Sequence, residues 1–147
     1  PGESMLDVGC GDGVLWRRLD DAGAAPRTYL GVDISAAAIE TAPQRGAGVE
    51  FRALDYDTAA DQIEDRFDVV VFNESLAYFR SPAGTLQQAF DRHLRPGGVV
   101  LVSLWDQPAY GDDALWRRLL AGRQVVAESE RRHPVHGSRW RAKALAT

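Results

Sequence analysis

The sequence predicts an α/β fold in which a mostly parallel sheet carries helices on both faces. Apolar or alternating runs typical of strands recur along the chain, and stretches with helical spacing of apolar residues separate most of them. Strands that alternate with helices favour parallel pairing through crossover connections. Two strand-like runs without a helix between them close the chain and predict a hairpin that adds one antiparallel strand. The 147 residues are enough for one domain with its own core.

The first elements are a strand, a helix and a second strand. Residues 5–8 are mostly apolar, which suits a short strand buried on both faces. Apolar residues at helical spacing follow, so we expect a helix over residues 14–21 that ends at Gly23. Residues 28–32 read as the second strand, and Asp33 follows that strand directly.

The middle of the chain predicts one more helix and two more strands. Ser35 is a good helix N-cap, and Pro43 closes the helix that it starts. Residues 49–53 alternate as a third strand that ends near Asp55. Residues 67–72 are almost wholly apolar, so this fourth strand is expected at the centre of the sheet.

The next helix begins at Ser81-Pro82, a cap followed by proline in the first turn. Leu86, Ala89, Phe90 and His93 share its apolar face, and His93 reads as a core histidine whose hydrogen bonds are satisfied. Residues 96–98, Pro-Gly-Gly, predict a sharp turn before a fifth strand. The remaining expected elements are a strand over 99–104, a helix over 113–121, and strands over 124–131 and 139–145 joined by a turn over 133–137.

Composition excludes several classes of protein. No apolar run approaches the roughly 18 residues of a membrane-spanning helix, and no signal-peptide pattern opens the chain. The single cysteine, Cys10, excludes an internal disulfide framework and fits a reducing compartment, so we expect a cytoplasmic protein with no membrane partner. Residues 114–147 carry eight basic and two acidic side chains, whereas the first 113 residues carry nine and nineteen. We interpret the basic end as a solvated strand face in preference to a surface for an anionic partner.

The chemistry of the chain is concentrated in Asp7-Val8-Gly9-Cys10-Gly11-Asp12-Gly13, between the first strand and the first helix. Glycines at such a turn let a ligand approach bare backbone at a helix N-terminus, although a glycine turn can also stand without a ligand. A dinucleotide-binding fingerprint would need glycine where Val14 stands. The D-x-G-x-G-x-G pattern is that of the class I S-adenosylmethionine-dependent methyltransferases, and the sequence resembles this family.

The resemblance implies a Rossmann-like three-layer sandwich whose seven-stranded sheet has the order 3-2-1-4-5-7-6 with strand 7 antiparallel. It implies S-adenosylmethionine as cofactor, with residues 7–13 against its methionine part, Asp33 on the ribose hydroxyls and Asp55 on the adenine amino group. Asp33 could instead be a charge at a helix N-terminus, and Asp57 lies close enough to exchange roles with Asp55. The implied cofactor-binding residues are Asp7, Gly9, Cys10, Gly11, Gly13, Asp33, Ile34, Leu54, Asp55, Tyr56 and Asn73.

Two further segments carry the resemblance. Residues 73–79, Asn-Glu-Ser-Leu-Ala-Tyr-Phe, resemble the N-E-x-L-x-Y-F segment of small-molecule methyltransferases, and residues 94–98, Leu-Arg-Pro-Gly-Gly, also recur in the family. If the acceptor must lose a proton, a base is required. The candidate catalytic residues are Glu74 first, then His133 and His136, which could equally be solvated turn residues. The candidate substrate-binding residues are Glu74, Tyr78, Trp105 and Tyr110.

The function implied is methyl transfer from S-adenosylmethionine to an oxygen, nitrogen or carbon atom of a small molecule. The fourth strand is not followed by N-P-P-Y, D-P-P-Y or a Pro-Cys pair, and the sequence has no evident metal-ligand cluster. The alternatives are an RNA or protein methyltransferase that uses the basic end strands, although a nucleic-acid partner is not expected, and a non-catalytic cofactor-binding regulatory module. We expect residues 1–147 to form one methyltransferase domain that lacks an N-terminal segment, because the first strand follows Pro1 almost at once.

Overall fold

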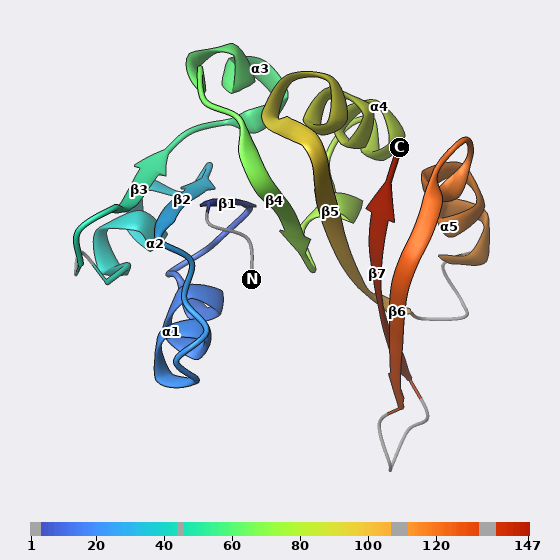
Figure 1. Ribbon diagram of the computed structural model, residues 1–147, viewed down its shortest axis with the longest axis horizontal. Helices are drawn as coiled ribbons and strands as arrows, with labels where there is room; N and C mark the ends of the chain where they lie inside the picture. The colour runs from blue at the N-terminus through green and yellow to red at the C-terminus, as the bar shows by residue number, and fades with distance from the viewer. Residues whose placement is uncertain (1–3, 44–45, 107–111, 133–137) are drawn as a thin grey trace.

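A computed structural model describes residues 4–43, 46–106, 112–132 and 138–147 of the chain. Within these residues seven strands form one sheet in the order β3-β2-β1-β4-β5-β7-β6 (Figure 1). The strands are β1 (Ser4–Val8), β2 (Thr28–Asp33), β3 (Val49–Ala53), β4 (Phe67–Asn73), β5 (Leu94–Asp106), β6 (Gln124–Arg132) and β7 (Arg139–Ala146).

The pairing of the strands confirms the predicted sheet. β1 lies between β2 and β4 and is parallel to both, and the parallel set continues to β3 on one side and to β5 on the other. β7 is antiparallel to β5 and to β6, with Val100 opposite Leu145 and Trp105 opposite Trp140. The strand order therefore reverses between β1 and β4, and the carboxyl ends of β1, β2, β3 and β4 meet at one edge.

The helices agree with the predicted ones where periodicity is clear. They are α1 (Val14–Asp21), α2 (Ala36–Thr41), α3 (Tyr56–Ala59), α4 (Pro82–Gln88) and α5 (Asp112–Leu120), with short turns η1 (Ala60–Gln62), η2 (Leu76–Tyr78) and η3 (Ala89–His93). The hydroxyl of Ser35 accepts the backbone N–H of Ala38 and caps α2, as predicted. The structure adds α3, η1 and η2, which are too short to show a period in the sequence. None of the described helices has both the length and the apolar character that crossing a bilayer requires.

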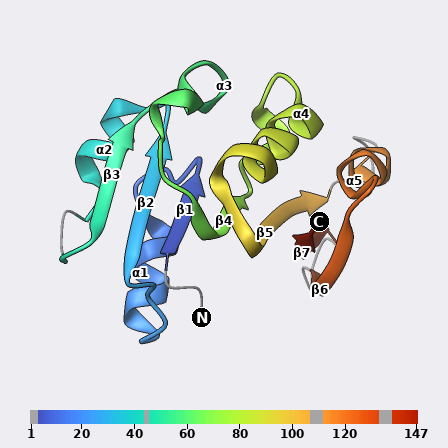
Figure 2. The ribbon, with the colours of Figure 1, turned by 45° about the horizontal axis from the view of Figure 1, so that its top comes forward.

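Two hydrophobic cores make the fold a three-layer sandwich. On one face of the sheet Trp16 of α1 and Ile39 of α2 pack with Tyr29 and Phe51. The larger core on the other face holds side chains from α4, α5 and the central strands: Leu86, Leu119, Val70, Phe72, Val100 and Val102. In the two ribbon views α1 and α4 lie on opposite sides of the strands (Figures 1 and 2). Among the described residues, helices therefore pack on both faces of the sheet.

The predicted turn at residues 96–98 is wrong. These residues belong to β5, where the register moves from Phe67 opposite Leu94 to Val69 opposite Val99, so the extra residues form a bulge. A Cβ on Gly98 would lie 2.7 Å from the carbonyl oxygen of Asp68, and Gly97 has a φ of +79°. The glycines therefore serve a bulge inside a strand, which shares its composition with a turn.

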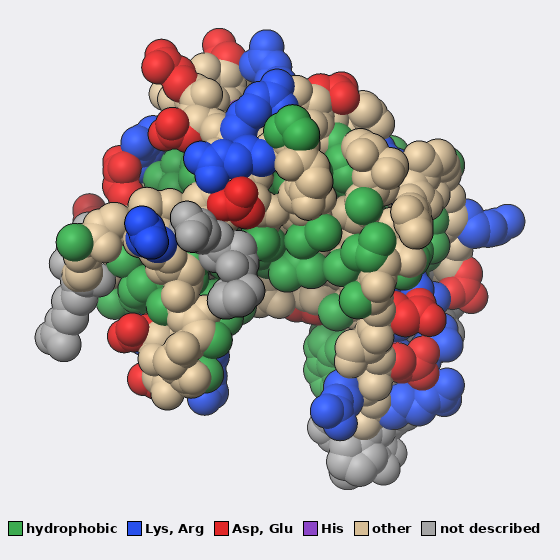
Figure 3. Space-filling model, in the orientation of Figure 1, with side chains coloured by type: hydrophobic (Ala, Val, Ile, Leu, Met, Phe, Trp, Pro, Cys, Tyr) green, Lys and Arg blue, Asp and Glu red, His purple; other side chains and the backbone are tan. Residues whose placement is uncertain are grey.

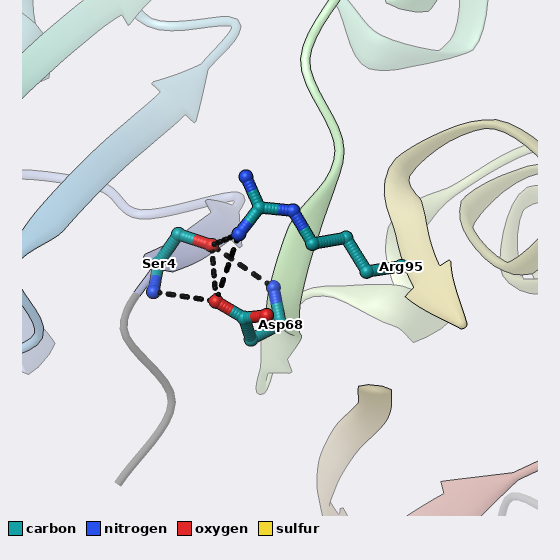
Figure 4. A network of polar contacts seen from close by, with 3 residues as sticks. All are labelled: Ser4, Asp68 and Arg95. Atoms are coloured by element: carbon teal, nitrogen blue, oxygen red, sulfur yellow. Dashed lines mark hydrogen bonds and ion pairs between the residues drawn. The ribbon is translucent and has the colours of Figure 1, made fainter. Parts of the chain in front are cut away.

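Polar contacts hold strands together at the end of the sheet that lies opposite the carboxyl ends of β1 to β4. The carboxylate of Asp68 accepts hydrogen bonds from the backbone and hydroxyl of Ser4, and Arg95 donates to both residues at 3.1 Å (Figure 4). The Ser4 hydroxyl, followed by Arg95, holds the pKa of Asp68 below its usual value. This cluster joins β1, β4 and the start of β5, three segments that are far apart in the sequence.

The predicted core role of His93 is confirmed. His93 is buried, and its Nε2 lies 3.2 Å from the carbonyl oxygen of Ala60, to which it must donate. Its Nδ1 then accepts the hydroxyl of Tyr56 at 2.7 Å. Burial lowers the pKa of His93, so this side chain is a neutral structural link between η3 and α3.

Candidate active site

The glycine turn after β1 adopts a conformation that requires glycine. Gly9, Gly11 and Gly13 have φ values of +79°, +55° and +78°. A Cβ on Gly9 would lie 2.4 Å from the Cβ of Ser75, whereas Gly11 faces open space. The backbone N–H groups of Gly9 and Cys10 donate to the carbonyl of Val32, so the turn is held against the end of β2.

Asp33 connects this turn to α2. One of its carboxylate oxygens accepts the backbone N–H of Gly11 and the other accepts the N–H of Ser35, both at 2.8 Å. The side chain therefore lies between the glycine turn and the N-terminus of α2, and its contact with the ribose hydroxyls stays a prediction. Each carboxylate oxygen has a second lone-pair direction and can still accept a hydroxyl of a ligand.

A cavity of about 290 Å³ lies at the carboxyl ends of β1 to β4. It brings together six of the predicted cofactor-binding residues and one predicted substrate-binding residue. Its lining is Gly9, Val32, Asp33, Ile34, Leu54, Asp55, Tyr56, Asp57, Ser75, Tyr78 and Phe79. Ile34 and Tyr78 are 74% and 89% exposed, so they form its rim. Asp7, Cys10, Gly11, Gly13 and Asn73 do not line this cavity.

The side of the cavity beside β3 combines apolar and acidic groups. Leu54 is buried, and its backbone N–H donates to the carbonyl of Asp33 at 2.8 Å. Asp55 caps α3 by accepting the backbone N–H of Asp57 and the hydroxyl of Thr58. Tyr56 is 2% exposed and its hydroxyl bonds to His93, so its polar end points into the core and not toward a ligand.

Four lining residues are not among the predicted site residues, namely Val32, Asp57, Ser75 and Phe79, although Asp57 was an expected alternative to Asp55. Ser75 donates its hydroxyl to the carbonyl of Val8 and packs against Gly9, which ties β4 to the glycine turn. The carboxylate of Asp57 accepts the N–H of Arg80 and the hydroxyl of Thr85, which ties α3 to the start of α4. Ser75 comes directly after Asn73-Glu74, and Asp57 lies two residues after Asp55. The residues that these two side chains contact, however, are distant in the sequence.

Asp7 lies beneath the glycine turn and is 1% exposed. The hydroxyl of Tyr29 donates to one carboxylate oxygen at 2.5 Å, and the other oxygen, Oδ1, has no hydrogen-bond partner among the described residues. Burial raises the pKa of Asp7 to about 6, although the Tyr29 hydrogen bond opposes this change, and the nearby charge of Asp33 adds to it. Asp7 is therefore a buried carboxyl with one oxygen still able to accept a donor.

Cys10 shares the core beside Asp7. The side chain is buried with Trp16 and Tyr29, and burial raises the pKa of its thiol far above the usual value. A thiol in this state is a poor nucleophile. Cys10 therefore serves as a small buried side chain of this core.

Asn73 is the last residue of β4 and Glu74 follows it, and both meet the end of β5. Glu74 has a φ of +57°, rare for a residue with a side chain. Its carboxylate accepts the backbone N–H of Trp105 at 2.6 Å, and the Ser103 hydroxyl lies 2.8 Å from its other oxygen and 2.9 Å from Oδ1 of Asn73. Glu74 is thus held toward β5 and does not line the cavity. Ser103 is a positioning residue that sequence reasoning missed.

The structure describes only some of the predicted substrate-binding and catalytic residues that follow β4. Trp105 is 46% exposed and stacks on Trp140 of β7. Tyr110, His133 and His136 lie outside the described residues, so their roles stay predictions. In the described part of the chain no group of three or more His, Cys, Asp or Glu side chains could hold a metal ion.

Comparison with known proteins gives the family. Residues 1–147 match the family model described as a methyltransferase domain. Ubiquinone biosynthesis O-methyltransferases of Pseudomonas fluorescens and Pseudomonas putida are 33% and 32% identical over 106 residues, which is 69% of this chain. The chain spans 44% of the length of these curated relatives.

Solved structures agree on the fold. The N-methyltransferase NodS from Bradyrhizobium japonicum WM9, in complex with S-adenosyl-L-homocysteine, has a TM-score of 0.80 at 16% identity over 98% of this chain and 77% of that chain. The [4+2]-cyclase SpnF has a TM-score of 0.76 at 17% identity over 99% of this chain and 75% of that chain. These similarities show a shared architecture alone. The match of the family model over the whole sequence shows that the chain belongs to the S-adenosylmethionine-dependent methyltransferases of class I, with S-adenosylmethionine as its cofactor.

Proposed function

We propose that this protein transfers a methyl group from S-adenosylmethionine to an oxygen, nitrogen or carbon atom of a small-molecule acceptor. The observation that carries the proposal is the cavity at the carboxyl ends of β1 to β4, where the glycine turn meets Asp33 and Asp55. The curated relatives are named for O-methylation in ubiquinone biosynthesis, which supports a small acceptor.

The residues of the cavity fit an adenosine group. Asp33 retains lone pairs for two ribose hydroxyls, and Ile34 and Leu54 offer apolar walls to a planar base. Asp55 would accept the amino group of that base. The glycine turn, with Asn73 at the end of β4, would hold the amino-acid end. The unpartnered Oδ1 of Asp7 beneath the turn suits a ligand that carries hydrogen-bond donors.

The protein's part in the reaction is positioning and proton removal. S-adenosylmethionine supplies, when bound, a methyl group made electrophilic by the adjacent sulfonium. The chain must align an acceptor atom with that methyl group and exclude water. An O–H or protonated N–H acceptor loses one proton for each methyl group that it gains. Glu74, oriented by Ser103 and Trp105, is the proposed group that takes this proton, with His133 and His136 as further candidates.

The ion pairs of the end strands favour a small acceptor over RNA or an acidic protein. Asp113 pairs with Arg139 and Arg141, while Glu128 pairs with Lys143. The basic charge counted in the sequence is therefore partly offset by acidic side chains, as the interpretation of a solvated face predicts. A cytoplasmic location is part of the proposal.

The test is calorimetric titration with S-adenosylhomocysteine, followed by a screen of small acceptors for methylated products. We expect micromolar binding of S-adenosylhomocysteine, no binding of NAD, and methylation of at least one small acceptor. Binding without transfer to any acceptor would favour the regulatory-module alternative. Transfer to RNA or protein alone would favour the macromolecular alternative.

A further inference from the structure

Two large aromatic side chains are exposed together at the end of β5. Trp105 and Trp140 lie opposite each other in the β5–β7 pairing, with ring centroids 6.1 Å apart and planes 16° apart. They are 46% and 36% exposed, whereas Trp16 and Trp116 are 6% and 2% exposed. Indole rings usually contribute to a core, so an exposed stacked pair is suited to bind another apolar or aromatic group.

The pair is joined directly to the proposed base. The backbone N–H of Trp105 donates to Glu74, and Ser103, two residues earlier in β5, contacts the other oxygen of that carboxylate. In the sheet Ser103 lies opposite Asn73 on β4 and Ala142 on β7. Side chains two residues apart lie on one face of a strand, so Ser103 and Ala142 share a face with the two indoles. Both are small and, together with Asn73, they line a cavity of about 360 Å³.

We propose that the Trp105–Trp140 pair binds the ring of a planar aromatic acceptor, whose hydroxyl or amino group then meets the Glu74 carboxylate. This inference rests on the proposed function and names its substrate class. A planar ring gains stacking contact with an indole face that a puckered saturated ring of similar size does not. The fixed carboxylate adds an acceptor for one O–H or N–H, so ring and polar group are recognised by adjacent parts of β5.

A purely structural role for the pair makes a different prediction. Cross-strand aromatic pairs stabilise sheets, and removing either indole would then lower the melting temperature without changing the preference between ligands. The ratio of the affinities for an aromatic ligand and its saturated counterpart separates the two roles, because changes in folding affect both ligands alike.

The experiment titrates the chain, saturated with S-adenosylhomocysteine, with 2-naphthol and with decahydro-2-naphthol in a calorimeter. We expect the wild-type chain to bind the aromatic alcohol about five- to tenfold more tightly, the size of one aromatic contact. Trp140→Leu should reduce this ratio to about one, and Trp140→Phe should keep most of it. Trp16→Phe, in the core on α1, is the control that should leave the ratio unchanged.

Three results overturn the inference. They are equal affinities for the two alcohols, no binding of the aromatic alcohol, and a ratio that survives Trp140→Leu. If S-adenosylhomocysteine binds and small acceptors are methylated in these cases, the proposed function stands and only the aromatic class fails. A wild-type chain that does not bind S-adenosylhomocysteine overturns both.

Discussion

At the scale of single residues, the site is built from carboxylates whose environments differ. Asp33 is partly exposed and holds two backbone N–H groups, Asp55 caps α3, and Asp7 is buried with one oxygen unpartnered. Hydrogen bonds donated to a carboxylate favour the ionised form of the group, whereas burial disfavours that form. The three side chains of one type can therefore serve as ligand acceptor, helix cap and buried acid.

Replacement of Asp33 tests the ribose assignment. Asp33→Ala should weaken S-adenosylhomocysteine binding by about 1–3 kcal/mol, the value of a hydrogen bond to a charged group. Calorimetry measures the change. Asp20→Ala, on the exposed side of α1, is the matched control and should bind normally. Unchanged affinity in Asp33→Ala would contradict the assignment.

Replacement of Glu74 tests the proposed base. Glu74→Gln keeps an acceptor for the Trp105 N–H but cannot take a proton, so S-adenosylhomocysteine affinity should hold while turnover falls about 100-fold or more. Ser103→Ala, which loosens the carboxylate without removing it, should reduce turnover less. Full turnover in Glu74→Gln would show that the proton goes elsewhere.

Asp7 should make the stability of the fold depend on pH. Its folded-state pKa of about 6 lies above the reference value of 3.8, so the folded chain binds more protons than the unfolded chain between these values. The free energy of unfolding should therefore fall as pH rises from about 4 to about 6, by roughly 3 kcal/mol from this group.

The measurement for Asp7 is urea unfolding across this pH range. Asp7→Asn cannot ionise and should lack this part of the pH dependence. Tyr29→Phe removes the hydrogen bond that favours the ionised form and so raises the folded-state pKa further, which should extend the fall in stability to higher pH and make it larger. Parallel curves for the wild type and Asp7→Asn would show that Asp7 does not titrate in this range.

At the scale of elements, the glycine turn carries two separate constraints. Gly9 and Gly11 both have a positive φ, which costs an alanine about 1 kcal/mol at either position. Only at Gly9 would the new Cβ also meet the Cβ of Ser75, at 2.4 Å. Gly9→Ala should therefore lower the free energy of unfolding by about 2 kcal/mol or more beyond Gly11→Ala. Urea unfolding compares the two variants, and equal losses would show that backbone conformation alone requires these glycines.

Elements were predictable from sequence where one local signal fixed them. Apolar runs gave the strands, and the N-cap Ser35 gave α2. Residues 56–62 form α3 and η1 because Asp55 caps the first turn, and so short a segment has no periodicity. The turn predicted at residues 96–98 was wrong because a bulge and a turn both use glycine. Only the pairing with the neighbouring strand distinguishes the two.

At the scale of the whole molecule, the alternation of strands and helices predicted a mostly parallel sheet, whereas its strand order came from the resemblance to the methyltransferase family. Contacts between segments that are distant in the sequence could not be predicted from local patterns. Ser75 meets Gly9, and Ser103 meets Glu74, only after the sheet has formed. The same holds for the stacking of Trp105 on Trp140 across two strands. The lining of the cavity at β1 to β4 was therefore more predictable than the contacts at the ends of β5 and β7.

The surface view shows how charged side chains are distributed on one face of the molecule. Acidic and basic side chains lie side by side near the lower right of Figure 3, over the end strands. Because Asp113 pairs with two arginines and Glu128 with Lys143, the basic end strands should attract a polyanion weakly. Binding of a single-stranded RNA should have a slope of log K against log salt shallower than about −2, which corresponds to fewer than three released counterions.

Asp113→Asn and Glu128→Gln together remove the ion pairs of Asp113 with Arg139 and Arg141 and the ion pair of Glu128 with Lys143. This double variant should bind oligouridylate more tightly and with a steeper salt slope, while its affinity for S-adenosylhomocysteine stays unchanged. Fluorescence anisotropy between 50 and 200 mM salt, a range over which phosphate contacts change binding strongly, gives both slopes. A wild-type slope that is already steep, and that the double variant does not change, would mean that the basic strands face a polyanion despite their ion pairs. The macromolecular acceptor would then replace the small molecule, because the charge of the end strands would be serving recognition and not the balance of the surface.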